Sequence, residues 1–380
     1  MELPREELPA LLERLHWKEA IALIGPRRAG KSTLAGMLSQ AWQAQGGRVA
    51  CFDFESEGAP RTAGEVARAA ESLPADCLLV LDEVQVVEDW TRFVRSQTDH
   101  SKRKVVIAGS SASLLSSEAA TSLAGRAVPE TVLPLSYRDA RRWGLRSVGE
   151  YLATGGFPEC ALRPLDAPKL HRIYFQLAVL RDVAARLRVR EQKALVDLAR
   201  LVLSEPGKAI AVGKTAARLG ISQPTFRSWI SAFNDAFLIL SIPPFFRSPR
   251  ERILADAKHY AIDTGLQRDV SLSASADLGR QVENLVAIEL TRRGYSLSFY
   301  SGKNSECDFI AQKIGKKNLA VQAYSGERDP PTREIEGLRE GMKRTGSEGL
   351  FISMHPVNFH LAGARQGLLE EWLLEPLVDG

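Results

Sequence analysis

The chain is poor in the residue types that build disulfide frameworks and metal centres. Its 380 residues include only four cysteines and six histidines. The cysteines are scattered singly, without the paired spacing of a zinc site. They are Cys51, Cys77, Cys160 and Cys307. We therefore expect them to be small buried residues rather than metal ligands or disulfide partners.

Long apolar runs are also missing. No segment reaches the roughly 20 consecutive apolar residues that a membrane-spanning helix needs, and the first residues, Met1 to Arg5, show no signal-peptide pattern. A net charge of +4 is too small to indicate nucleic-acid binding over the whole chain. We expect a cytoplasmic protein with no membrane partner, and the length predicts two or three domains.

Short runs of β-branched residues and leucine alternate with helical stretches between Ile21 and Pro134. This alternation is typical of a parallel sheet covered by helices. The expected strands are Ile21–Ile24, Val49–Phe54, Leu78–Leu81, Val105–Ala108 and Glu130–Leu133. We assign residues 1–135 to this α/β domain, and residues 136–203, where the strand signal fades, to a helical lid.

A phosphate-binding loop follows the first expected strand. Residues 25–32 have the pattern G-x-x-x-x-G-K-[ST] between a strand and a helix, which predicts a site for ATP and Mg²⁺. Gly25 and Gly30 let the backbone curl so that its N–H groups point at phosphate oxygens. Lys31 would reach the β and γ phosphates, and the Ser32 hydroxyl would bind Mg²⁺. The expected nucleotide-binding residues are Gly25, Pro26, Arg27, Arg28, Ala29, Gly30, Lys31, Ser32 and Thr33.

Two carboxylates end the third expected strand, at Asp82 and Glu83. Carboxylates at the end of a buried strand are costly unless they meet a cation. We expect Asp82 to bind Mg²⁺ through water, and Glu83 to activate the water that attacks the γ-phosphate. A helix N-terminus is the alternative interpretation of these two acids. The additional strand at Val49–Phe54 favours the class of P-loop proteins that uses a catalytic glutamate over the small GTPases.

Two more candidates follow the fourth expected strand. Ser110 lies at the tip of that strand, where it would sense the γ-phosphate, and a simple turn serine is the alternative. Arg126 precedes the fifth strand and would reach the nucleotide of a neighbouring subunit in a homo-oligomer, where it would stabilise transition-state charge. A solvated surface arginine is the alternative for Arg126.

These motifs, with others further along the chain, resemble one group of proteins. These are the prokaryotic AAA+ ATPases whose P-loop domain is followed by a winged helix and a restriction-endonuclease-like domain of unknown function. The matching stretches are residues 25–32, Leu81–Gln85 with Trp90, Gly109–Ser111, Leu123–Arg126, Pro134–Tyr137, Gly155–Glu159 and Asp263–Leu266. The resemblance implies AAA+ topology and ATP hydrolysis. It also implies that Gly156 to Pro158 line the adenine side of the lid, which adds Pro158 to the nucleotide-binding set.

Residues 204–265 predict a winged-helix, DNA-binding domain. Val212–Gly220 and Thr225–Phe237 are expected helices separated by a tight turn, with apolar residues spaced for one small core. The start of the second helix is where a recognition helix meets DNA, and the arginine-rich stretch that follows would track a phosphate backbone as a wing. The expected contacts are Thr225, Arg227, Ser228, Arg247, Arg250 and Arg252. A winged helix that serves only for packing is the alternative.

Residues 266–380 resemble the PD-(D/E)xK nuclease core, in which a glutamate on a helix, an aspartate and an ExK strand hold Mg²⁺. Glu283 and Asp308 match, but Gln322 and Tyr324 stand at the positions of the expected glutamate and lysine. An amide weakens Mg²⁺ binding, and without the lysine the attacking water has no obvious activating partner. We therefore expect a nuclease-like fold with little or no cleavage. The lysines available as substitutes, which we expect to be surface charges, are Lys303, Lys313, Lys316 and Lys317.

The sequence thus predicts an α/β chain with an AAA+ parallel-sheet P-loop ATPase domain, a helical lid, a winged helix and a C-terminal restriction-endonuclease-like domain. We expect a Mg²⁺-dependent ATP hydrolase that works as an oligomeric DNA motor or remodeller, with branched DNA as one candidate substrate. Two alternatives stay open. One is an ATP-dependent signalling or defence switch with a protein partner, and the other is an active Mg²⁺-dependent DNA nuclease coupled to the ATPase.

Overall fold

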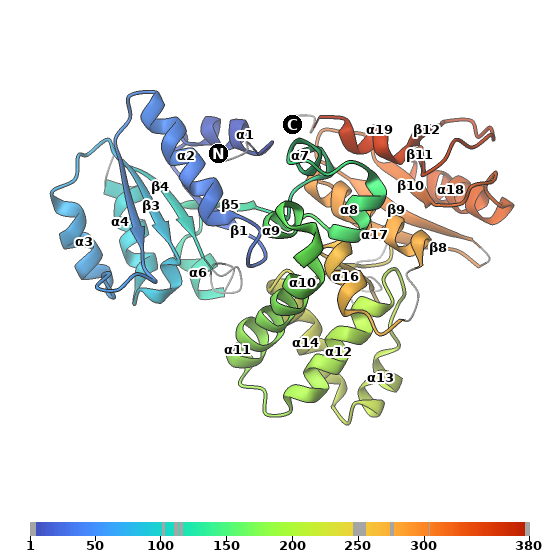
Figure 1. Ribbon diagram of the computed structural model, residues 1–380, viewed down its shortest axis with the longest axis horizontal. Coiled ribbons are helices and arrows are strands. Elements are labelled where there is room, and N and C mark those ends of the chain that lie inside the picture. Colours follow the sequence, from blue (N-terminus) through green and yellow to red (C-terminus); the bar gives the residue numbers. More distant parts are fainter. Residues whose placement is uncertain are drawn as a thin grey trace. The chain divides into compact units, whose positions relative to one another are not determined.

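The structure, a computed structural model, describes residues 5–100, 103–109, 114, 117–245, 256–273, 277–303 and 305–376. It divides into two compact units (Figure 1). One contains Met1–Leu135 with Asp235–Phe237, and the other contains Ser136–Asn234 with Leu238–Gly380. The segments expected to form a lid, a winged helix and a nuclease-like domain therefore share the second unit. The boundaries drawn between these segments stay predictions.

The first unit contains the expected parallel sheet. Its order is β2-β3-β4-β1-β5, and all the pairings are parallel. The strands are β1 Ala20–Ile24, β2 Val49–Asp53, β3 Leu78–Asp82, β4 Lys104–Ala108 and β5 Ala127–Thr131. The fifth strand begins three residues earlier than expected because Ala127 already pairs with Ala20.

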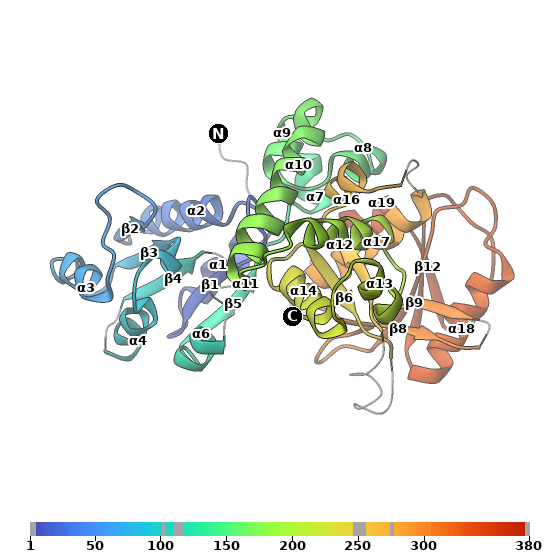
Figure 2. The same ribbon diagram turned by 90° about the horizontal axis from the view of Figure 1, so that it is seen from below.

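Helices cover both faces of this sheet, and alternate strand residues supply the two cores. Leu79, Leu81 and Ile107 face one core, whereas Leu78, Val80 and Val106 face the other. Figure 2 shows α2 and α4 on opposite faces. The helical elements of this unit are α1 Leu8–Arg14, α2 Lys31–Ala44, α3 Ala63–Glu71, η1 Val84–Val86, α4 Trp90–His100 and α6 Ser117–Ser122.

The second unit begins with a run of helices. They are α7 Tyr137–Arg142, α8 Val148–Thr154, α9 Pro158–Leu162, η2 Pro164–Asp166, α10 Ala167–Gln176, η3 Leu177–Ala184, α11 Ala185–Leu187 and α12 Gln192–Ser204. The next elements are α13 Val212–Arg218, α14 Gln223–Asp235, the antiparallel strands β6 Ile239–Ile242 and β7 Lys258–Ala261, and α16 Thr264–Val270. The chain thus forms two helices and then a pair of antiparallel strands in this segment, and its assignment to a winged helix stays a prediction.

A second sheet completes this unit. Its order is β12-β11-β10-β9-β8, antiparallel from β8 to β10 and parallel from β10 to β12. The elements are α17 Leu278–Arg292, β8 Ser296–Ser301, β9 Glu306–Gln312, β10 Leu319–Tyr324, α18 Thr332–Thr345, β11 Glu348–Ser353, β12 Ala364–Leu368 and α19 Leu369–Leu374. Helix α18 lies against β9 at Gly337, where an added Cβ would meet the Glu306 carbonyl oxygen at 1.9 Å.

No helix in the described residues is long and apolar enough to cross a membrane.

Candidate functional site

The phosphate-binding loop connects β1 to α2, in a backbone conformation that requires glycine at two positions. Gly25 has a φ of 146°, and an added Cβ would lie 2.1 Å from the Val132 carbonyl oxygen. Gly30 has a φ of 93° and is the N-cap of α2 without a side-chain cap. No N-cap side chain bonds the first amides of α2, and the N-terminus of a helix is a position that favours an anion.

Lys31 is held at this loop. Its side chain is buried, and Nζ donates to the carbonyl oxygens of Gly25 at 3.0 Å and Pro26 at 2.9 Å. The side chains of Ser32 and Thr33 are exposed at the start of α2. A cation, backbone amides and a hydroxyl thus lie together, and this donor set fits a nucleotide phosphate with Mg²⁺.

Arg5 is a residue of this region that the sequence analysis missed. Its guanidinium is buried, donating from Nη1 to the Ala29 carbonyl oxygen at 2.6 Å and from Nη2 to the Leu133 carbonyl oxygen at 2.8 Å. Glu7 accepts two further hydrogen bonds from it. The phosphate loop is therefore tied to the chain end and to the residues after β5. No local pattern marks such a long-range contact.

The acidic pair lies at the same edge of the sheet as the loop. Strands β1 and β3 are both neighbours of β4 and parallel to it, so their carboxyl ends meet at one edge. Asp82 ends β3, and its Oδ1 accepts a 3.0 Å hydrogen bond from the Glu83 amide. Within the described residues, no group of three or more metal-ligating side chains is gathered in a metal-binding geometry.

Glu83 has a partner that was not expected. Gln85, on η1, donates a hydrogen bond from Nε2 to Glu83 Oε2. Glu83 has the left-handed backbone conformation, with φ 51° and ψ 41°. Gly109, just after β4, leaves room for the amide, since an added Cβ would lie 2.1 Å from Gln85 Oε1. The candidate base is thus held in a defined orientation.

The two other catalytic candidates differ in what the structure shows. Ser110 lies outside the described residues. Arg126 precedes β5, and its Nε donates to both carboxylate oxygens of Asp99 on α4 at 2.9 Å. The hydrogen bond from Arg126 lowers the pKa of Asp99. Arg126 therefore has a partner in its own subunit.

The segment from α13 to α14 exposes some of the residues that were expected to contact DNA. Gly220 has a φ of 67° in the turn, and the Ser222 hydroxyl accepts a hydrogen bond from the Thr225 amide at 3.1 Å. Arg227 and Ser228 on α14 are exposed, whereas Thr225 is half-buried. The three expected wing residues, Arg247, Arg250 and Arg252, lie outside the described residues.

Two of the stretches that carry the family resemblance, Gly155–Glu159 and Asp263–Leu266, meet inside the second unit. Asp263 accepts hydrogen bonds from the Gly156 amide at 2.6 Å and the Leu266 amide at 2.8 Å. An added Cβ on Gly155 would lie 2.1 Å from Asp263 Oδ1. Burial raises the pKa of this carboxyl. Pro158, the expected adenine contact, is the first residue of α9, just after this junction.

His171 completes that buried junction. Its Nδ1 lies 2.7 Å from Asp269 Oδ2, and its Nε2 lies 3.7 Å from Asp263 Oδ1. The imidazole is fully buried. It therefore connects α10 to α16 through two carboxylates.

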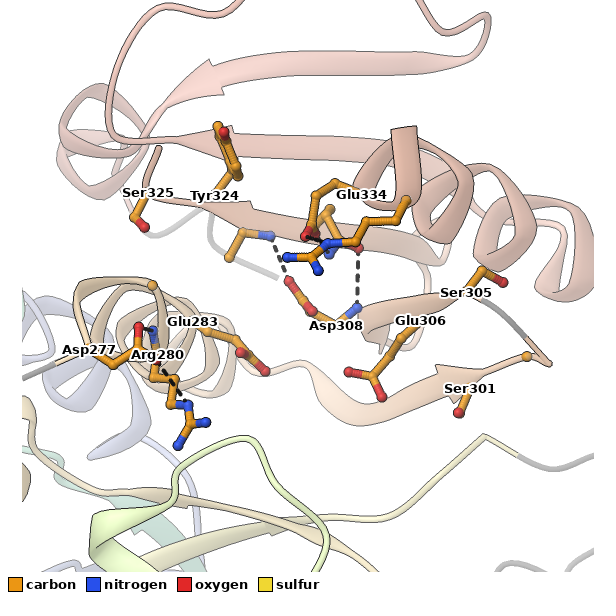
Figure 3. Close-up of a pocket in the computed structure, with 15 residues that line it drawn as sticks. Asp277, Arg280, Glu283, Ser301, Ser305, Glu306, Asp308, Tyr324, Ser325 and Glu334 are labelled. Carbon is orange, nitrogen blue, oxygen red and sulfur yellow. Dashed lines mark hydrogen bonds and ion pairs between the residues drawn. The ribbon is translucent and has the colours of Figure 1, made fainter. Parts of the chain in front are cut away.

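A polar pocket of about 590 Å³ lies in the C-terminal part of the second unit (Figure 3). The four residues of the expected degenerate nuclease site all line it, and they are Glu283, Asp308, Gln322 and Tyr324. Asp308 is 7% exposed, and its Oδ2 accepts a 2.9 Å hydrogen bond from the Ala323 amide. Burial raises the pKa of Asp308 and of Glu283. None of the four substitute lysines named above lines this pocket.

A different lysine lies behind the pocket wall. Lys258, on β7, places its Nζ 2.5 Å from Glu306 Oε1 and 3.6 Å from Glu283 Oε1. Tyr260, on the same strand, donates to Glu283 Oε1 at 2.6 Å. Burial acts to lower the pKa of Lys258, but the carboxylates of Glu283, Asp308 and Glu306 outweigh it and raise that pKa. These carboxylates therefore favour the charged form of the Lys258 ammonium.

Comparison with known proteins supports the prediction of an AAA-type domain in the first unit. Residues 18–140 match the family model of an AAA domain, and residues 145–276 match a domain of unknown function (DUF8612). An uncharacterized protein of Haemophilus influenzae is 30% identical over 377 residues, covering 92% of this chain and 93% of that protein. The chain is an AAA-domain protein of this family.

Other matches to this AAA-domain protein are more partial. An uncharacterized protein of Methanocaldococcus jannaschii is 31% identical over 306 residues, covering 73% of this chain and 68% of that protein. Among solved structures, AMPPCP-bound DnaA from Aquifex aeolicus matches with a TM-score of 0.31 and 12% identity, over 62% of this chain and 90% of that one.

Proposed function

We propose that this AAA-domain protein is a Mg²⁺-dependent ATP hydrolase. The observation that carries the proposal is the placement of a lysine-bearing phosphate loop and an acidic strand end on strands that flank β4. The AAA-domain match supports it. ATP hydrolysis needs charge stabilisation on the phosphates and a positioned water, and these residue types supply both.

Each residue has a separate task in this proposal. Lys31 exchanges the carbonyl oxygens of Gly25 and Pro26 for phosphate oxygens, and the amides at the start of α2 bind the remaining negative charge. Ser32 and Asp82 would hold Mg²⁺, which would neutralise charge on the phosphates. Glu83 takes a proton from the attacking water. The contact from Gln85 positions the Glu83 carboxylate before a substrate arrives.

We further propose that Arg126 acts on the site of a neighbouring subunit. To do so it must leave Asp99, which holds it in its own subunit. We expect Arg126→Ala to lower ATP turnover by about 1,000-fold, because a trans-acting arginine is worth that much in phosphoryl transfer. The measurement is steady-state phosphate release over a range of protein concentrations.

Mixed oligomers give the control for Arg126. Glu83→Gln subunits lack the base but keep Arg126, so adding them to Arg126→Ala subunits should restore part of the turnover. Asp99→Asn, which releases the arginine, should not reduce it. Normal turnover by Arg126→Ala at every concentration would show that Arg126 has no catalytic role.

The proposed action of the ATPase is remodelling of DNA. This proposal is supported by two exposed side chains on α14, those of Arg227 and Ser228. They follow the turn in which the Ser222 hydroxyl accepts a hydrogen bond from the Thr225 amide. An arginine that contacts phosphate releases about one counterion on binding. Arg227→Ala should therefore weaken duplex binding and reduce the slope of log K against log salt by about one. Arg339→Ala, an exposed arginine on α18, is the matched control and should change neither quantity.

Turnover with and without DNA tests the remodeller against a protein-binding switch. We expect duplex, single-stranded or four-way-junction DNA to stimulate ATP hydrolysis, and the stimulation to fall as salt is added. Glu83→Gln serves as the blank. Slow turnover that is the same with all three DNAs would favour the switch and leave the ATP site intact.

A further inference from the structure

The pocket in the second unit is lined by more acidic than basic side chains. Five acids and two arginines line it, and each arginine forms an ion pair with an acid of the same lining. The pairs, each at 3.2 Å, are Arg280 with Asp277 and Arg333 with Glu334. The lining contains no basic partner for the other three acids, which are Glu283, Glu306 and Asp308.

One ammonium approaches these three carboxylates from behind the lining. Lys258 Nζ lies 2.5 Å from Glu306 Oε1 and 3.6 Å from Glu283 Oε1. Burial and the Glu283 carboxylate raise the pKa of Asp308, so the two carboxylates are close enough to repel one another. One positive charge thus stands against three carboxylates, and a further cation inside the pocket would stabilise their ionised forms.

Asp308 has one carboxylate oxygen that can bond a group inside the pocket. The residue is 7% exposed, and its Oδ2 accepts a hydrogen bond from the Ala323 amide at 2.9 Å. Its Oδ1 accepts no hydrogen bond from the part of the chain that the structure describes. Figure 3 shows the side chains of Glu283 and Glu306 pointing toward one another below Asp308. An unpartnered oxygen on a buried carboxylate favours a ligand that donates N–H groups.

Glu334 is held at the same pocket by an amide on β10. Gln322 Nε2 donates to Glu334 Oε2 at 2.7 Å, and Gln322 Oε1 accepts a hydrogen bond from the Asp308 amide at 3.4 Å. The arginine paired with Glu334, Arg333, has a side chain that is 80% exposed, so solvent weakens that ion pair. Gln322 thus connects the carboxylates of Asp308 and Glu334 and orients them before a ligand arrives.

The placement of these acids favours an extended organic cation over a metal ion. A metal ion needs ligands that converge on one point, and no group of three or more metal-ligating side chains does so in the described residues. The acids come instead from α17, β9 and α18, around a cavity of about 590 Å³. Small-molecule sites have volumes of roughly 300–1,000 Å³. An ammonium has three N–H donors and a guanidinium five, so separated groups of this kind can each bond a carboxylate.

We propose that this pocket binds an organic cation that carries two or more separated amino or guanidino groups. One group bonds Asp308 Oδ1, with Glu283 beside it, and another bonds Glu334. A free polyamine and a basic segment of a partner protein both present this chemistry. Binding offsets the repulsion among carboxylates that Lys258 neutralises only in part. All of these residues lie in the second unit, so the inference does not rest on ATP hydrolysis.

The test is calorimetric titration of the full chain with spermidine, at low salt and without nucleotide. We expect saturable binding that Asp308→Asn and Glu334→Gln each weaken at least about tenfold, because each variant loses a charge-assisted hydrogen bond. Glu336→Gln is the matched control and should leave the affinity unchanged. Glu336 lies two residues further along α18, its side chain is 43% exposed, and it does not line the pocket. Circular dichroism checks that each variant is folded.

Three further titrants distinguish the chemistry and the source of the cation. Butylamine has one amino group, and binding as tight as that of spermidine would overturn the requirement for separated groups. Mg²⁺ binding tighter than that of spermidine would identify a metal site and overturn the proposal. A blocked peptide with two arginines should bind more tightly than spermidine if the source is a protein segment, and less tightly if it is a free polyamine. Spermidine binding that neither Asp308→Asn nor Glu334→Gln weakens would also overturn the proposal.

Discussion

Glu83→Gln should lower the turnover of ATP by about 100-fold to 10,000-fold while nucleotide still binds. A general base contributes about this much, and the amide that replaces it cannot take a proton from water. The change keeps the size of the side chain. It also leaves Lys31 and the amides of α2 in place, so the phosphates keep their contacts. Steady-state phosphate release and equilibrium binding of a fluorescent nucleotide measure the two effects separately.

Glu88→Gln is the matched control for this experiment. Glu88 is an exposed acid a few residues along the same loop, so its substitution should change neither turnover nor binding. Turnover within about threefold of the wild type in Glu83→Gln would exclude Glu83 as the general base. A loss of nucleotide binding equal to the loss of turnover would indicate instead that Glu83 holds the site together.

Asp263→Ala should destabilise the second unit by about 3 kcal/mol. The substitution leaves the amides of Gly156 and Leu266 buried without an acceptor, and each orphaned buried donor costs about 1–3 kcal/mol. It also removes one of the two carboxylates beside His171. Urea denaturation followed by tryptophan fluorescence would measure the change as a lower transition midpoint.

Asp256→Ala is the control for Asp263. It removes an exposed aspartate seven positions earlier in the sequence and should change the free energy of unfolding by less than about 0.5 kcal/mol. If Asp263→Ala unfolds at the wild-type urea concentration, the contact between the two glycines and the carboxylate does not stabilise this unit. Restored hydrogen bonding in Asp263→Asn should recover part of the loss.

The conformation of the phosphate-loop motif and the position of the acidic pair could be predicted largely from the sequence because these parts are local. The loop residues are contiguous, their glycines are required by their own backbone angles, and Asp82 and Glu83 are adjacent at a strand end. The parallel sheet was also predictable, since buried strands leave continuous apolar runs. The order of strands then brings the loop and the acids to one edge.

Contacts between distant residues could not be predicted in this way. Neither the pairing of Arg126 with Asp99 nor that of Lys258 with Glu306 leaves a periodic signal. The lysines expected as substitutes lie between β8 and β10 in the sequence, whereas Lys258, beside the pocket, lies on β7 in another sheet. The place of such a charged side chain depends on how the strands are ordered in the sheets. That order cannot be inferred from the residue types at single positions.

Arg5 shows that the boundary of a recognised domain and the physical boundary of a site can differ. The AAA-domain match begins at residue 18, yet Arg5 bonds the carbonyl oxygen of Ala29 within the phosphate loop. The same guanidinium also holds the Leu133 carbonyl oxygen. A shortened chain that starts at residue 18 would retain every residue of the phosphate-loop motif. It would lose the Arg5 guanidinium, which holds the phosphate loop to the residues after β5.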